Sequence, residues 1–238
     1  MRFQLLLVII CMTFLSISFA QSVEQFTQYN VSYTFLEEGV IEVNKFMLLR
    51  NIHSVGIVPG PVEFRTSVLE GNEFEIFDLQ ATNRHGENLT SRILEFSEYT
   101  AIGVNVFTPI LPGFEYEINL NYKIRLNNTP GILFKRVQLP LVQQTRVPIL
   151  AGNIEINVPN NHFITHTNFR DNFTTISSNT ITFELTDETP EYVLIEYSRV
   201  PSRIGGFAGS LVFWILVNAV LFSILIYEIV RGFRRKKN

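Results

Sequence analysis

Hydrophobic and polar residues alternate along most of the chain before residue 203. The longest run covers 114–126, where seven apolar or aromatic positions alternate with six polar or charged ones. Because successive side chains of a strand point to opposite faces, this run predicts one strand with a core face and a solvent face. Residues 29–35 alternate in the same way, and 40–49 follow after a short turn, so these two segments predict a hairpin.

Turn residues separate such segments throughout the region 21–203, at spacings of about 8 to 12 residues. No window in this region has the periodicity of a long helix. The pattern predicts an all-β ectodomain with an immunoglobulin-like β-sandwich fold. The strand number suits either one large sandwich or two in tandem, with a possible subdivision near 127–131.

The two ends of the chain have a different pattern. Residues 1–20 contain a basic residue, a short apolar core and small residues at Ser18 and Ala20, which predicts a signal peptide cleaved after Ala20. Residues 204–230 are almost wholly apolar and long enough for one transmembrane helix. The short tail 231–238 is basic and is therefore expected in the cytoplasm, so the region before it is extracellular or lumenal.

Charge and cysteine content exclude several classes of function. Residues 21–203 hold 13 basic and 21 acidic residues, a net charge of −8, which is the wrong sign for nucleic-acid binding. The one cysteine, Cys11, lies in the predicted signal peptide, so thiolate chemistry is excluded from the mature protein. Membrane-surface basic residues in the tail are expected to meet anionic lipid headgroups: Arg231, Arg234, Arg235, Lys236 and Lys237.

Four sequons in the region 21–203 are candidate glycosylation sites. Their asparagines are Asn30, Asn88, Asn127 and Asn172. Asn88 and Asn127 fall in predicted turns and are the better candidates.

Catalytic and metal-binding patterns are weak. His162 and His166 are four residues apart in a strand-like segment, which places them roughly 13 Å apart, too far to share a metal. Paired acidic residues, such as Glu115 with Glu117 and Glu73 with Glu75, fall on the expected solvent faces of strands. With no recognisable catalytic motif, we expect a protein that is not an enzyme and that has no cofactor and no metal.

The predicted transmembrane helix indicates a function more strongly than the catalytic and metal-binding patterns do. Gly205 and Gly209, like Gly206 and Ser210, are four residues apart, a spacing that allows close approach of another helix. Asn218 falls near the middle of the membrane, where an amide requires a partner. These residues predict a protein partner within the membrane.

The order of features resembles that of ribophorin I, a non-catalytic oligosaccharyltransferase subunit. The similarity rests on Leu111-Pro112-Gly113 before a long alternating strand through Tyr122, on a later strand ending at Val158-Pro159, and on the single C-terminal anchor. The resemblance covers roughly 21–203 and implies an accessory or scaffolding role without catalysis.

We therefore expect a non-catalytic type I single-pass membrane protein whose β-sandwich binds a protein or glycan partner. It would act as an accessory subunit of a membrane complex, with a possible link to glycosylation. The cell membrane and the endoplasmic reticulum are both compatible locations. The alternative is a free-standing cell-surface receptor or adhesion module.

Overall fold

The structure of the chain is a computed structural model. It describes residues 22–36, 39–67, 74–97, 99–126, 134–141, 145–168, 174–177, 179–185, 189, 192–199 and 215–227. The predicted signal peptide and basic tail lie outside these residues.

Almost all of the described chain before residue 200 forms β-strands and the turns between them, which confirms the prediction of an all-β region. In chain order the strands are β1 (Glu24–Phe35), β2 (Val40–Asn51), β3 (Gly60–Ser67), β4 (Phe74–Thr82), β5 (Ser91–Glu95), β6 (Tyr99–Val106), β7 (Glu115–Leu126), β8 (Phe134–Pro140), β9 (Gly152–Asn157), β10 (Phe163–Thr167), β11 (Thr174–Ile176), β12 (Thr180–Glu184) and β13 (Tyr192–Ser198).

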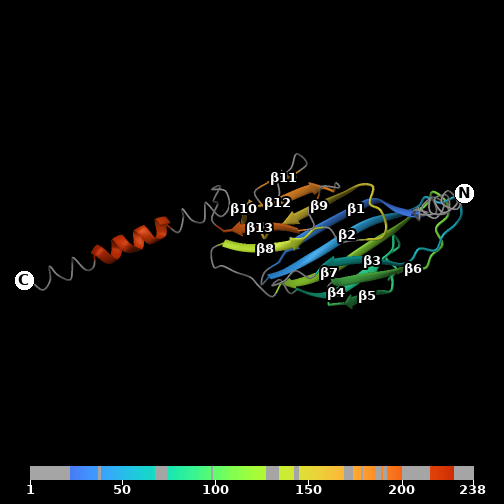
Figure 1. The fold of residues 1–238 in the computed structure, drawn as a ribbon, viewed down its shortest axis with the longest axis horizontal. Coiled ribbons are helices and arrows are strands. Elements are labelled where there is room, and N and C mark those ends of the chain that lie inside the picture. The colour runs from blue at the N-terminus through green and yellow to red at the C-terminus, as the bar shows by residue number, and fades with distance from the viewer. Residues whose placement is uncertain are drawn as a thin grey trace, which may run out of the picture.

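The strands form one large sheet and two small ones (Figure 1). The seven-stranded sheet has the order β11-β12-β9-β1-β2-β7-β4, and the small sheets are β10-β13-β8 and β3-β6-β5. Strands from both sides of 127–131 share the large sheet, because β9 pairs with β1 in parallel. This arrangement of three sheets differs from the two-sheet immunoglobulin-like sandwich expected from the sequence. Local alternation of residues specifies strands but carries no information on which distant strands pair.

The alternation in the sequence correctly identifies the buried faces of the central strands. On β1, Tyr29, Val31, Tyr33 and Phe35 are at most 4% exposed. On β7, the inward residues from Ile118 to Ile124 are buried, and the polar residues between them face outward. Phe114 is an exception, because it precedes the strand and is 65% exposed.

Both small sheets pack on the same face of the large sheet and form one core with it. Phe64 of β3 lies 6.2 Å from Phe26 and 6.4 Å from Tyr29, measured between ring centroids. At the other end of β1, Phe35 contacts the Tyr197 ring of β13 edge to face at 5.3 Å. The opposite face of the large sheet carries outward-pointing polar side chains.

Residues 215–227 form a helix that lies within the predicted transmembrane segment. Its apolar side chains are mostly exposed, including Leu216, Val220 and Phe222. At 1.5 Å per residue the helix is about 20 Å long. Among the described residues, no helix reaches the length and apolar character needed to cross a bilayer.

Candidate functional site: a concave polar sheet face

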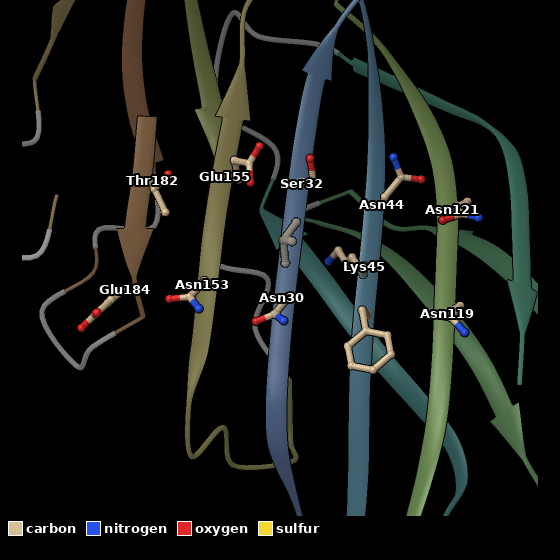
Figure 2. Close-up of a pocket in the computed structure, with 12 residues that line it drawn as sticks. Asn30, Ser32, Asn44, Lys45, Asn119, Asn121, Asn153, Glu155, Thr182 and Glu184 are labelled. Carbon is tan, nitrogen blue, oxygen red and sulfur yellow. The ribbon is translucent and has the colours of Figure 1, made fainter. Parts of the chain in front are cut away.

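A hollow lies on the outer face of the seven-stranded sheet (Figure 2). It has a volume of about 540 Å³ and crosses strands β12, β9, β1, β2 and β7. We call this surface the concave face and define it by ten outward residues: Asn30, Ser32, Asn44, Phe46, Asn119, Asn121, Asn153, Glu155, Thr182 and Glu184.

Strand register aligns these residues in two rows across the sheet. One row runs Glu184, Asn153, Asn30, Phe46 and Asn119 from β12 to β7. The neighbouring row runs Thr182, Glu155, Ser32, Asn44 and Asn121 across the same strands. Directly opposite side chains on adjacent strands lie about 5 Å apart, so each row brings its side chains close together, and all of them except Phe46 are polar.

Much of the hydrogen-bonding capacity on this face is not used by the part of the chain that the structure describes. The amides of Asn30, Asn44, Asn121 and Asn153 make no hydrogen bond to any other described side chain or main-chain group. Each amide can donate two hydrogen bonds and accept two. Four such groups beside one half-buried aromatic ring, Phe46, form a surface that can bind a ligand rich in hydroxyl groups.

Other polar groups on or beside the face are held in place by neighbours. The Asn119 amide donates to Glu117 at 2.8 Å, and Asn157 donates to Glu155 at 2.7 Å. Thr180 in turn donates its hydroxyl proton to the Asn157 side chain at 2.9 Å. These bonds orient the Glu155 carboxylate, which lines the hollow.

The ionisable side chains of the concave face are acidic. Glu155 and Glu184 line it, and Lys45, which contributes to its floor, points its side chain to the opposite face and into the core. Lys45 is 2% exposed, and its Nζ donates to the Tyr29 hydroxyl at 3.1 Å. Burial lowers the pKa of Lys45 to about 7. The concave face therefore lacks a lining cation among the described side chains and is unsuited to phosphate.

The predicted glycosylation sites differ in accessibility. Asn30 lies at the centre of the concave face, and Ser32 of the same sequon points in the same direction. Asn88 is exposed in the connection after β4 and forms an isolated bridge with Thr82. Asn127 and Asn172 lie outside the described residues.

Of the predicted helix-packing residues, only Asn218 can be placed. It lies on the helix 215–227 and is exposed. Gly205 and Gly209 lie outside the described residues, as do the basic residues of the tail.

The candidate metal and acid–base residues are engaged structurally. His162 packs edge to face on Tyr197 at 5.5 Å, and its pKa is lowered by burial and by the nearby cations Arg199 and Lys135. Glu115 accepts a hydrogen bond from Thr27, and Glu75 pairs with Arg125 at 3.0 Å. Within the described ranges, no three His, Cys, Asp or Glu side chains lie close enough to hold a metal ion.

Sequence reasoning did not identify the concave face. Its asparagines lie on four strands and are separated by up to about 120 residues along the chain. The sequence contains one indication of this face, because Asn recurs at outward positions of β1, β2, β7 and β9. Only the register between these strands brings the residues together.

Comparisons with known proteins do not assign this chain to a family. No family model matches the chain, and no curated protein matches it. Among solved structures, the M1 zinc metallopeptidase from Deinococcus radiodurans is 12% identical with a TM-score of 0.37, over 75% of this chain and 42% of the other. A mutant two-domain M1 zinc metallopeptidase bound to L-arginine gives the same identity and TM-score and is covered over 43%. This chain thus spans less than half of those proteins, and similarity at this level supports no functional conclusion.

Proposed function

We propose that this chain is a non-catalytic, membrane-tethered protein that binds a neutral glycan on its concave face. The observation that carries the proposal is the group of four amides on the same face as Phe46 that make no hydrogen bond to any described residue. Amides match sugar hydroxyls because both donate and accept hydrogen bonds. An aromatic ring adds an apolar surface for the C–H face of a sugar.

The shape and charge of the face support a glycan over other ligands. A hollow of about 540 Å³ falls within the range of small-ligand sites, and its open form suits an extended oligosaccharide. The carboxylates of Glu155 and Glu184 can accept hydrogen bonds from hydroxyl groups but disfavour anionic ligands. A protein surface is less well matched, because protein interfaces bury a more apolar centre than this face offers.

The membrane part of the proposal rests on the sequence. The apolar run 204–230 and the basic tail support a single-pass type I topology with the β-region outside the cytoplasm. An accessory subunit of a glycosylation complex, like ribophorin I, is one setting in which a glycan-binding face would be useful. A cell-surface receptor is the other.

The test is binding of neutral oligosaccharides to the full-length chain in detergent. A high-mannose oligosaccharide serves as the probe, and isothermal titration calorimetry measures its affinity. Replacing Asn44 and Asn121 together by Ala removes two unpaired amides of one row. Because each lost hydrogen bond to a neutral group contributes about 0.5–1.5 kcal/mol, loss of one bond from each amide should weaken binding by the double variant roughly 5- to 150-fold.

The matched control is Glu95→Gln, which alters an exposed polar residue on β5, outside the concave face. It should bind as the wild type does. Equal affinity of the wild type and the Asn44→Ala, Asn121→Ala variant would refute the assignment of the glycan to this face.

A further inference from the structure

One end of the β-region exposes an unusual concentration of large apolar side chains. The residues belong to the β2–β3 loop, the β6–β7 loop and the segments that lead into β1 and β9. We call this surface the apolar tip. Its side chains are between 40% and 69% exposed: Val23, Ile52, Val55, Val58, Phe107, Leu111, Phe114 and Leu150.

Main-chain hydrogen bonds tie these segments together at the same end of the sheets, on the right in Figure 1. Ile57 and Ile110 exchange two main-chain hydrogen bonds, at 3.0 and 2.8 Å. The amide of Ile52 donates to the Val23 carbonyl at 3.0 Å. The exposed side chains therefore belong to one surface.

A buried asparagine holds the two long loops of the tip in place. Asn51 is fully buried, and its Nδ2 donates to the carbonyls of Val55 and Ile110, both at 2.8 Å. Its Oδ1 accepts from the His53 amide at 2.8 Å, and its main-chain carbonyl accepts from Gly113 at 2.9 Å. The apolar side chains thus project from a pre-organised scaffold, which lowers the entropy cost of docking.

The tip is nearly uncharged and large enough for a protein interface. Across 51–59, 107–114 and 145–151, Arg146 is the only Lys, Arg, Asp or Glu. From the exposed fractions and typical side-chain areas, its apolar surface is on the order of 700 Å². A standard interface buries about 800 Å² on each partner, and isolated monomers rarely expose a patch this large without a function.

The tip lies at the opposite end of the sheet from the exit of the chain towards residues 204–230. Tyr197, near the end of β13, contacts Phe35 at the end of β1, whereas Phe26 at the start of β1 lies beside the tip. Nine strand residues at about 3.3 Å each separate these two ends by roughly 30 Å. If 204–230 is the anchor, as in the proposed function, the tip faces away from the membrane that holds it.

We propose that the apolar tip is a homophilic contact by which copies of this chain in facing membranes bind tip to tip. A two-fold contact joins the same patch on both copies, and an uncharged apolar patch meets its copy without like-charge repulsion. Insertion into lipid is less well supported, since the three loop segments contain no Trp or Tyr, the aromatic residues enriched at membrane interfaces, and Arg146 is their only basic residue available to attract anionic headgroups.

The test reconstitutes the full-length chain into two liposome populations with different fluorophores and measures tethering by energy transfer. The test variant carries Phe107→Ser and Leu111→Ser. The matched control carries Phe96→Ser and Leu36→Ser, which remove an exposed phenylalanine and leucine away from the tip. Circular dichroism verifies that both variants remain folded.

We expect liposomes that carry the wild-type chain to tether to each other. Tethering should fall at least ten-fold with the tip variant and should stay unchanged with the control variant. Tethering to protein-free liposomes would instead assign the tip to lipid and overturn the homophilic contact. Absence of tethering by incorporated wild-type chain would also overturn it.

Flotation of the chain with the liposomes tests the membrane anchor independently of the tip-to-tip contact. A chain that does not float refutes the anchor, and sedimentation in detergent then decides the tip. A wild-type dimer that becomes a monomer in the tip variant supports tip-to-tip contact, whereas a wild-type monomer excludes it.

Discussion

Replacing the buried Lys45 by Met should make the chain more stable at neutral pH, by an amount that falls as pH rises. Lys45 lies in the core between β2 and the small sheet that contains β3, and it is 2% exposed. Its Nζ lies 5.1 Å from the centroid of the Phe64 ring and 5.8 Å from that of Tyr122. Methionine has a similar length and needs no hydration, so it fills the same space.

The pH dependence follows from the protonation of this lysine. Burial lowers the Lys45 pKa to about 7, whereas an exposed lysine in the unfolded chain has a pKa of about 10.4. Between these values the folded chain holds a neutral amine, and unfolding takes up a proton. The free energy of unfolding therefore rises with pH, by up to about 1.4 kcal/mol per pH unit.

From about pH 7 to pH 9.5 the stability of the wild type should rise by about 3 kcal/mol relative to Lys45→Met. Attraction between the ammonium and the surrounding rings, worth up to about 2 kcal/mol, and loss of the buried hydrogen bond to the Tyr29 hydroxyl, worth about 1 kcal/mol, both reduce the excess stability of the variant near pH 7. Burial also raises the pKa of Tyr29 and of Tyr33, so tyrosine ionisation in the unfolded chain lowers stability above about pH 10. The measurement therefore stays below that pH.

Urea unfolding of the full-length chain in detergent, followed by far-UV circular dichroism, provides the assay. The matched control is Lys123→Met, because Lys123 lies on the outer face and pairs with Asp78 at 2.8 Å. The pKa of Lys123 is raised by this partner, so the control should show no comparable change below pH 9.5. A stability difference between wild type and Lys45→Met that is the same at both pH values would refute the reasoning.

Three further substitutions and one modification test other parts of the fold. Gly152→Ala should cost more than 3 kcal/mol or prevent folding, because a Cβ there would clash with the main-chain oxygen of Tyr29; urea unfolding measures the loss. Asn51→Ala should cost about 3 kcal/mol and increase proteolysis of the tip loops, since it removes the side-chain donor to the carbonyl of Ile110, in a buried hydrogen bond, and to that of Val55, in a part-buried one. Tyr33→Phe should cost about 1 kcal/mol of unfolding free energy, because it removes a buried hydrogen bond to the end of β8. In a glycosylating host, peptide mass spectrometry should find Asn88 more fully modified than Asn30, because Asn88 is exposed in the connection after β4 whereas Asn30 is half-buried on the sheet.

The local features of the fold could be predicted from the sequence, because one face of each central strand is core and the other is solvent. The alternation in β1 and β7 therefore assigns the orientation of their side chains. It fails at Phe114, where the apolar pattern continues but the strand has not yet begun. There the Phe114 carbonyl accepts from the main-chain amide of Asn51, which keeps the residue in the tip loop.

The sheet order and the concave face could not be predicted, because they depend on contacts between distant residues. Asn30 and Asn153 face each other only because β9 joins β1 in parallel. A pairing between distant strands does not change the periodicity of hydrophobic and polar residues within either strand. The buried Lys45 was missed for another reason, since a lysine within an alternating strand normally identifies the solvent face.

The parallel pairing of β1 with β9 also affects how the chain is made. Tyr29 lies opposite Gly152, about 120 residues later, so β1 leaves the ribosome long before its second neighbour exists. Until then the inner edge of the earliest hairpin has unpaired main-chain groups that can join a strand of another molecule. The central sheet cannot be completed before β9 is synthesised. We therefore expect the chain to fold slowly and to depend on chaperones during synthesis.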